Sequence, residues 1–181
     1  MSTNQGDQAS KDFLRSLIRD VPNFPTDGIL FKDITPLLRN AEAFDLAVSE
    51  FSKVSQKFDL VAGVEARGFI FAAAVAKMSG KGFIPIRKSG KLPAASFSES
   101  YALEYGESIL QIHQDAVQSG ERVMLIDDVL ATGGTLGAAV KLIVRSGGVV
   151  DSVAVLLEIS GLGGQQKFSE NNPGLEISIL L

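Results

Sequence analysis

The alternation of apolar runs with helical segments constrains the fold of this chain most strongly. The run "FDLVAGV" at 58–64 is typical of a buried strand, and it is followed by the turn "EARG", the helical segment "FIFAAAVAKM" and the run "GFIPIRK" at 82–88. The same order recurs at 123–157. Helical connections of this length join parallel neighbouring strands. The sequence therefore predicts an α/β fold with a doubly wound, mainly parallel twisted sheet flanked by helices.

The N-terminal forty residues carry separate expectations. Residues 1–10 are polar and predict a loose tail, and a short helix should follow, since apolar residues recur at helical spacing at Leu14, Leu17, Ile18 and Val21. Residues 20–40 hold three prolines and a glycine and predict a structured loop or hood. A second amphipathic helix is expected at 44–54.

The segment at 89–108 differs from the rest of the chain. It is polar, carries two tyrosines and is long for a structureless connection, which is typical of a functional flap loop. The following "SILQIHQ" alternates in the manner of an edge strand. We expect the tail, the hood, the sheet and the flap to belong to one domain spanning 1–181.

Composition excludes several kinds of site and partner. The absence of cysteine excludes disulfides and thiolate chemistry, and a lone histidine, His113, excludes a metal site of several imidazoles. The net charge of −4 argues against a general nucleic-acid binder. Apolar runs do not reach membrane-spanning length, and the polar first ten residues do not resemble a signal peptide. We therefore expect a cytoplasmic protein with neither a nucleic-acid nor a membrane partner.

The stretch "VMLIDDVLATGGT" at 123–135 combines an apolar run, two acids and a turn rich in threonine and glycine. Small residues in "ATGGT" allow a close backbone approach, threonine hydroxyls add donors, and the start of the following helix favours an anion; these residues are Ala131, Thr132, Gly133, Gly134 and Thr135. A Walker A loop is excluded because no Gly-Lys-Ser/Thr follows, and no GxGxxG lies on a strand–helix turn. The pattern predicts a phosphate site.

Two aspartates, Asp127 and Asp128, precede this predicted phosphate site directly. Taken alone, the aspartates are explained equally well as solvated acids at a strand end. Taken alone, the glycines of the loop are explained equally well as residues that only turn the chain. Together they are more specific, because carboxylates repel phosphate but accept hydrogen bonds from vicinal hydroxyls and can help to hold magnesium. A ribose 5-phosphate has both groups a few ångströms apart.

At this point a family resemblance emerges. "VMLIDDVLATGGT" resembles the phosphoribosyl pyrophosphate signature of type I phosphoribosyltransferases. Further segments are similar, in order and spacing, to the adenine phosphoribosyltransferase family: "FPTDGILFKDITPLL", "EARGFIF", "IPIRKSGKLP", "YALEYG" and "LLEISGLGG". The resemblance covers most of the chain, although the first ten and last dozen residues contribute little. It implies the transfer of phosphoribose to adenine, giving AMP and pyrophosphate, with magnesium held mainly by the substrate and Asp127 and Asp128 nearby.

The resemblance also implies roles for single residues. Asp127 and Asp128 would hold the ribose hydroxyls and the 131–135 loop the 5-phosphate. The pyrophosphate would be bound by Glu65, Ala66, Arg67, Arg87, Lys88 and Lys91, with the Glu65–Ala66 bond in a special, strained or cis geometry. A solvated basic surface is the alternative for "RKSGK". The family implies a homodimer in which Arg87 acts in trans.

The flap and the base pocket follow from the same resemblance. Glu104 matches the catalytic carboxylate of a flap that closes over the sugar, and Tyr105 would pack over the site. Residues 20–40 would form part of the base-binding hood, with adenine beside Phe24, Ile29, Arg67 and Ile159. For Phe24 and Ile29, a place in the core is an equally good expectation.

Two alternatives remain open at this point. One is the same transferase fold acting on another base, such as hypoxanthine, guanine, xanthine or orotate, although "FPTDGILFKDITPLL" favours adenine. The other is a regulator that keeps the nucleotide site as a sensor and has lost catalysis. The presence of Glu104 and of the "RKSGK" cations argues against the regulator.

Overall fold

The computed structural model describes residues 3–102 and 107–181 of the chain, with side chains from residue 8 onward except at Ala102. These residues form two units, the first covering 1–50 with Leu181 and the second Phe51–Leu180. Each unit is described by itself, and the expectation of one domain spanning the chain stays a prediction. In the described ranges, every helix is too short or too polar to cross a membrane.

The first unit contains helices and a small β-hairpin. Helix α1 runs over Thr3–Ser16 and α2 over Thr35–Arg39, and α3, Ala41–Lys53, begins in this unit. The prediction of a loose tail at 1–10 is therefore wrong for most of that range. Asp12 accepts a hydrogen bond from Gln8 at 2.8 Å and pairs with Arg15 at 3.4 Å, and such pairs one turn apart support a polar helix.

The predicted hood segment is an ordered hairpin. Strands β1, Arg19–Pro22, and β2, Leu30–Asp33, pair antiparallel, with Val21 opposite Phe31. The connecting turn is closed by the Asn23 side chain, which accepts the Gly28 amide at 2.9 Å. At the tip of this turn Phe24 is 51% exposed and packs edge-on against Phe31, with ring centroids 5.1 Å apart.

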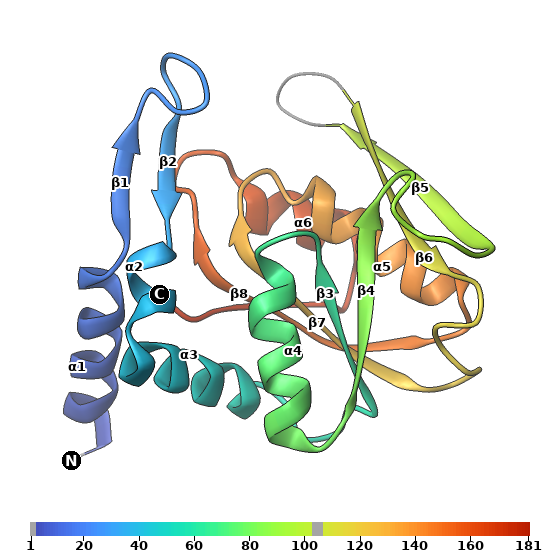
Figure 1. Cartoon of the computed structure of the whole chain (residues 1–181), viewed down its shortest axis with the longest axis horizontal. Helices are drawn as coiled ribbons and strands as arrows, with labels where there is room; N and C mark the ends of the chain where they lie inside the picture. The colour runs from blue at the N-terminus through green and yellow to red at the C-terminus, as the bar shows by residue number, and fades with distance from the viewer. Residues whose placement is uncertain (1–2, 103–106) are drawn as a thin grey trace. The chain divides into compact units, whose positions relative to one another are not determined.

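The second unit is built on a seven-stranded sheet in the order β5-β6-β4-β3-β7-β8-β9 (Figure 1). Five strands, from β4 to β9 along the sheet, are parallel, and β5 and β6 are antiparallel additions. The bounds of the elements are β3 Leu60–Val64, α4 Gly68–Ser79, β4 Gly82–Lys88, β5 Ser96–Ala102, β6 Glu107–His113, β7 Arg122–Leu130, α5 Gly134–Arg145, β8 Val149–Glu158, α6 Gly164–Asn171 and β9 Ile177–Ile179. The predicted α/β class is confirmed.

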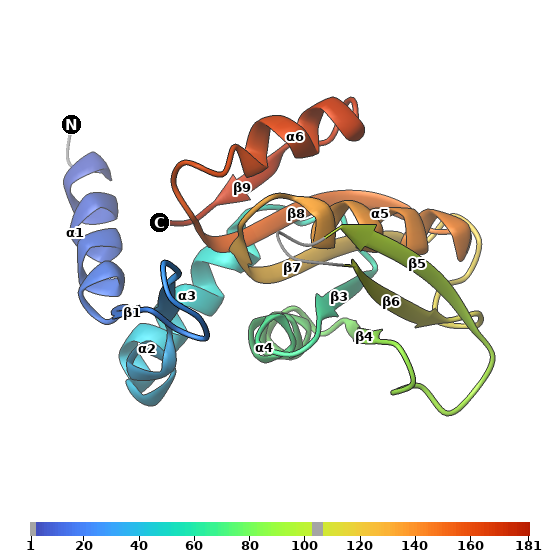
Figure 2. The same ribbon diagram turned by 90° about the horizontal axis from the view of Figure 1, so that it is seen from above.

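The two predicted crossovers run in opposite directions along the sheet. The connection from β3 through α4 leads to β4 on one side, and that from β7 through α5 leads to β8 on the other. Because such crossovers are right-handed, α4 and α5 must cover opposite faces of the sheet, as Figure 2 shows. The strand order reverses between β3 and β7, and ligands of open α/β sheets bind at the carboxyl ends of strands at such a point.

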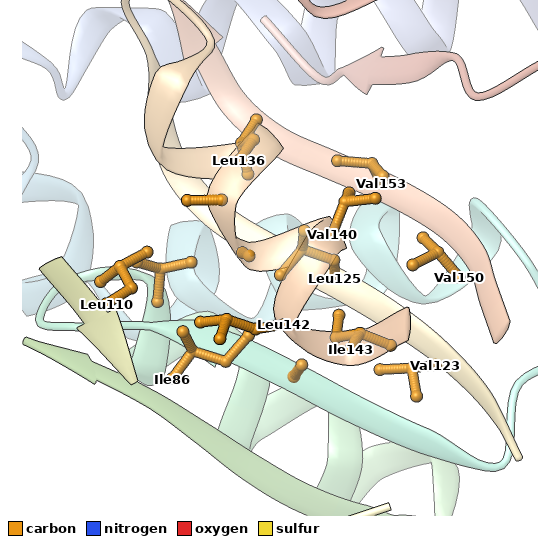
Figure 3. Packing of buried hydrophobic residues seen from close by; sticks show 14 of the residues in the cluster. Ile86, Leu110, Val123, Leu125, Leu136, Val140, Leu142, Ile143, Val150 and Val153 are labelled. Carbon is orange, nitrogen blue, oxygen red and sulfur yellow. The ribbon is translucent and has the colours of Figure 1, made fainter. Parts of the chain in front are cut away.

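The core of this unit lies between α5 and the sheet. Side chains from β4, β6, β7, α5 and β8 meet there, as Figure 3 shows, and they include Ile86, Leu110, Leu125, Leu142 and Val153. Each of these five is fully buried. Removing this apolar surface from water stabilises the unit and holds the strand ends that carry the polar residues.

Two sequence expectations need correction in this unit. The 89–108 segment is not a structureless loop, because β5 occupies Ser96–Ala102, and β6 is not the edge strand, because β5 pairs along its outer side. The alternation in "SFSESY" puts Phe97 and Tyr101 on one face, against the core. The polar composition concealed this pattern. Helix α6 and strand β9 were not predicted.

Candidate functional site at the carboxyl ends of β3, β4 and β7

The two aspartates lie inside strand β7 and not beyond its end. Strand β7 continues to Leu130, with Asp127 opposite Val155 of β8. Both aspartates are buried, with exposed fractions of 8% for Asp127 and 6% for Asp128. Strand β7 thus includes both acids, and the alternative of two solvated acids is wrong.

Asp127 faces the start of helix α4. Its Oδ1 accepts the Asp128 amide at 2.9 Å, and a Cβ added to Gly68 would lie 2.7 Å from the same oxygen. Position 68 therefore has to be glycine for α4 to approach β7 this closely. Burial, followed by the charge of Asp128, raises the pKa of Asp127 well above its ordinary value.

Asp128 forms an ion pair with Arg67, whose Nε lies 2.7 Å from Asp128 Oδ2. Arg67 directly precedes α4, so this pair joins the carboxyl end of β3 to that of β7 across the point where the strand order reverses. Burial raises the pKa of Asp128, and the Arg67 charge opposes that rise without cancelling it. The structure thus brings two separately predicted residues into contact.

The 131–135 loop leads from β7 into α5. Gly133 has φ +83°, a conformation that residues other than glycine rarely adopt, and α5 begins at Gly134. An open cavity of about 820 Å³ lies beside the loop. Of the described residues that line it, Thr132, Gly133 and Gly134 were predicted to bind phosphate.

Other residues of this cavity were missed at the sequence level. They come from β5, α5, the loop after β8 and α6, and include Tyr101, Lys141, Leu162, Lys167 and Phe168. Lys141 pairs with Glu99 at 3.0 Å, and Lys167 donates to the Leu162 carbonyl at 3.1 Å. A helix in 164–171 was not expected, since "GQQKFSEN" shows a weak apolar face, so no local signal pointed to Lys167 and Phe168.

The predicted pyrophosphate residues gather at the neighbouring ends of β3 and β4. The Glu65–Ala66 peptide bond is cis, one of the geometries considered from the sequence. Arg87 donates to both carboxylate oxygens of Glu65, at 3.2 and 3.3 Å, and to the Lys91 carbonyl at 2.9 Å. The Lys88 amide donates to Glu65 at 3.0 Å, and the side chains of both lysines are exposed.

Glu65 therefore holds Arg87 within its own chain. Burial raises the pKa of Glu65, but the hydrogen bonds from Arg87 and from the Lys88 amide outweigh it, so the net shift is downward. The carboxylate stays ionised, and it fixes the base of the 87–91 turn that carries the exposed cations. This anchoring role of Glu65 was not predicted.

The remaining predicted residues fall in three places. Glu104 and Tyr105 lie outside the described residues. Phe24 and half-buried Ile29 belong to the first unit, and Arg67 and Ile159 to the second. The Ile159 amide donates to the Leu130 carbonyl at 2.8 Å, which extends the pairing of β7 and β8 beyond the aspartates. An adenine pocket that draws on both units stays a prediction.

The site has two neighbouring buried carboxylates that could contact a metal ion. Within residues 3–102 and 107–181, groups of three or more His, Cys, Asp or Glu that could hold a metal do not occur. The buried pair Asp127 and Asp128 supplies oxygen donors, which suit magnesium, and this ion usually takes one or two carboxylates together with substrate phosphates and water. The residues present are compatible with magnesium that arrives with a phosphorylated substrate.

Comparison with known proteins agrees with this geometry. The family described as "Phosphoribosyl transferase domain" matches residues 36–167. The adenine phosphoribosyltransferase of Cutibacterium acnes is 50% identical over 165 residues, which cover 91% of this chain and 93% of that protein. That of Thermobifida fusca is 52% identical over 155 residues, 84% of this chain and 88% of the relative.

Solved structures give the same result. The crystal structure of adenine phosphoribosyltransferase from Thermoanaerobacter pseudethanolicus matches with a TM-score of 0.88 at 47% identity, covering 94% of this chain and 98% of that one. The Saccharomyces cerevisiae enzyme, solved with an imino-altritol bisphosphate and adenine, matches with a TM-score of 0.89 at 32% identity. The match covers 96% of this chain and 99% of that one. The chain is an enzyme of the glycosyltransferase class, and it belongs to the adenine phosphoribosyltransferases of the phosphoribosyl transferase family.

Proposed function

We propose that the chain transfers the 5-phosphoribosyl group from phosphoribosyl pyrophosphate to adenine, giving AMP and pyrophosphate in purine salvage in the cytoplasm. One observation carries the proposal: two buried carboxylates and a glycine-bearing loop at a helix start follow one another at the carboxyl end of β7. The names of the relatives support it, and so does the adenine bound in the yeast structure.

In this mechanism Asp127 and Asp128 accept hydrogen bonds from the two ribose hydroxyls, and the backbone amides and hydroxyls of the 131–135 loop bind the 5-phosphate. Arg67, Lys88 and Lys91 supply positive charge to the departing pyrophosphate, and Arg87 supplies a further cation in trans, to the partner's site. The sugar is thus fixed at both ends while the bond at C1 breaks.

As the C1–oxygen bond to pyrophosphate lengthens, positive charge develops on the ribose in an oxocarbenium-like transition state, and a purine nitrogen attacks C1. Glu104 in the flap stabilises this charge and exchanges a proton with the purine. Closure of the flap over the sugar excludes water, which would otherwise intercept C1. Magnesium, bound with the pyrophosphate near Asp127 and Asp128, would supply further positive charge to the leaving group.

The proposed adenine-binding residues come from both units. Phe24 and Ile29, of the first unit, would provide apolar walls, and Arg67 and Ile159, of the second, would also contact the base. The exposure of Phe24 supports its role, because an aromatic ring at a hairpin tip is available to stack on a base. A place for Phe24 in the core is not supported at this exposure.

One assay separates the candidate activities. Purified protein is incubated with phosphoribosyl pyrophosphate, magnesium and one base at a time, and nucleotide formation is followed. We expect AMP from adenine and little product from hypoxanthine, guanine, xanthine or orotate. Turnover of one of these four but not of adenine would assign another base, and no turnover with any base would favour the nucleotide sensor. Omission of magnesium should greatly reduce the rate.

Replacement of Glu104 by alanine tests its catalytic role. We expect turnover to fall by roughly 10²-fold or more with only a small change in AMP affinity, because the carboxylate acts mainly on charge that develops in the transition state. Steady-state kinetics and calorimetric AMP binding measure the two quantities, with Glu107→Ala as the neighbouring acidic control. If turnover and AMP affinity fell by the same factor, Glu104 would be a binding residue.

A homodimer in which Arg87 serves the partner's site is part of the proposal. Arg87→Ala and Glu104→Ala variants, each nearly inactive, are mixed, unfolded and refolded together. If Arg87 acts in trans, each mixed dimer regains one complete site, and about a quarter of the sites should recover. If Arg87 acts only in its own chain, where it binds Glu65, the mixture stays inactive. Size-exclusion chromatography with light scattering measures the dimer itself.

A further inference from the structure

The 131–135 loop has little means of fixing its own conformation. Its residues are small, and Gly133 takes φ +83°, which an unconstrained glycine would exchange readily for other values. An anion site made of backbone amides binds well only if those amides already point to one place. Some other part of the chain must therefore hold the loop.

Helix α6 lies directly against this loop. A Cβ added to Gly164, the first residue of α6, would overlap with the carbonyl oxygen of Ala131 and lie 3.0 Å from Leu130 Cγ. Such a close approach of two backbones is possible only with glycine at position 164. The helix start thus contacts the residue at which the strand ends and the loop begins.

The contact is reciprocal. A Cβ added to Gly133 would lie 2.9 Å from the Gly164 carbonyl oxygen and 3.3 Å from Phe168 Cβ. The Phe168 side chain is 1% exposed and belongs to the hydrophobic core. Thr132, Gly133 and Phe168 line the same 820 Å³ cavity, so the loop and the helix that contacts it border one open space.

Helix α6 is tied back to the same strand ends. The Gln165 amide donates to Glu158 Oε1 at 3.3 Å, and Glu158 is the β8 residue paired with Leu130 of β7. A carboxylate at a helix start also interacts favourably with the helix dipole. Glu158 therefore connects strand β7, which precedes the loop, with helix α6, which packs against the loop.

From these contacts we infer that Gly164 and Phe168 are positioning residues, which hold the 131–135 loop in the conformation that binds the 5-phosphate of the ribose. The inference rests on the proposed function, since it assigns α6 to the phosphate end of the same substrate. It predicts that changes in α6 alter the binding of ribose phosphates while leaving adenine recognition intact.

The test compares two adjacent glycines. Gly164→Ala forces the Ala131 carbonyl to move, and we expect the KM for phosphoribosyl pyrophosphate and the Kd for ribose 5-phosphate to rise by ~10-fold or more, with the KM for adenine nearly unchanged. Gly163→Ala is the control: at φ +66° with nothing within 4 Å of an added Cβ, it strains the backbone without touching the loop. It should lower the melting temperature but leave the Kd unchanged.

Phe168→Leu provides a second variant if Gly164→Ala does not fold, since it keeps an apolar side chain; a smaller rise of the same two constants is expected. Unchanged constants in the folded variants, or an equal rise in Gly163→Ala, would overturn the role of α6. If the wild type binds ribose 5-phosphate without turning over adenine, the proposed function fails, and the Kd comparison still decides the role of α6. A wild type that does not bind ribose 5-phosphate contradicts both.

Discussion

Asp127→Asn should nearly abolish transfer and, at neutral pH, make the ligand-free protein more resistant to unfolding. The asparagine keeps the oxygen that accepts the Asp128 amide, so the backbone at the end of β7 is preserved. It removes an ionisable group whose charged form is disfavoured by burial and by Asp128, and it replaces the acceptor that a ribose hydroxyl requires. Because hydrogen bonds to charged groups contribute about 1.5–3 kcal/mol, we expect kcat/KM for phosphoribosyl pyrophosphate to fall by ~10²-fold.

The stability difference should depend on pH in a defined direction. The pKa of Asp127 is raised in the folded protein, so between its ordinary value of 3.8 and the raised value the folded chain keeps a proton that the unfolded chain releases. The free energy of unfolding of the wild type therefore falls as the pH rises through this window. Asp127→Asn lacks this loss, so the difference between its free energy of unfolding and that of the wild type should grow from pH 4 upward.

Urea unfolding of both proteins at several pH values measures this difference, with kinetics on the same samples. Glu99→Gln, which changes an acid in the exposed pair with Lys141, is a suitable control and should show little pH-dependent difference. An asparagine variant that is less stable than the wild type at pH 8 would contradict the assignment. It would mean that the charged Asp127 is stabilised by its surroundings in the absence of a ligand.

Replacement of Arg67 by methionine should reduce both stability and activity. Asp128 would lose its charged partner while staying buried, and we expect the free energy of unfolding to fall by about 2 kcal/mol at pH 8, a moderate value because Arg67 is partly exposed. The loss should become smaller as the pH is lowered, because the pKa of the buried Asp128 is raised and its carboxylate can take up a proton. The loss of a cation from the pyrophosphate site should lower kcat by ~10²-fold or more.

A double-mutant cycle isolates the ion pair. Adding Asp128→Asn to the Arg67→Met variant removes the unpaired charge, so the double variant should be more stable than Arg67→Met alone, with a coupling energy of ~1–3 kcal/mol. Activity should not recover, since both groups act on the substrate. Additive losses of stability would show that Arg67 and Asp128 are independent in solution, and the link between β3 and β7 would have to be abandoned.

Much of the fold was predictable because its signals are local. The runs that became β3, β4, β7 and β8 are short, apolar and separated by helical segments, and this pattern alone requires parallel strands. Strand β5 escaped prediction because its serines and glutamates hide an alternation that becomes visible only once β6 pairs with it in register. Helix α6 escaped because its stabilising contact is a close backbone approach to a distant loop, and no spacing in the sequence encodes such an approach.

The site, like the fold, was predictable where its signals are local and not where it depends on contacts between distant residues. The sequence by itself determined which chemical groups are present at 127–135, a carboxylate pair followed by a loop suited to an anion, because these groups are adjacent in the chain. Only the tertiary structure decided that the carboxylates are buried, that Arg67 pairs with Asp128, that Glu65 binds Arg87 and that Gly164 supports Ala131. Each of these contacts joins residues far apart in sequence, and it depends on the strand order β4-β3-β7-β8, which local patterns of hydrophobicity cannot specify.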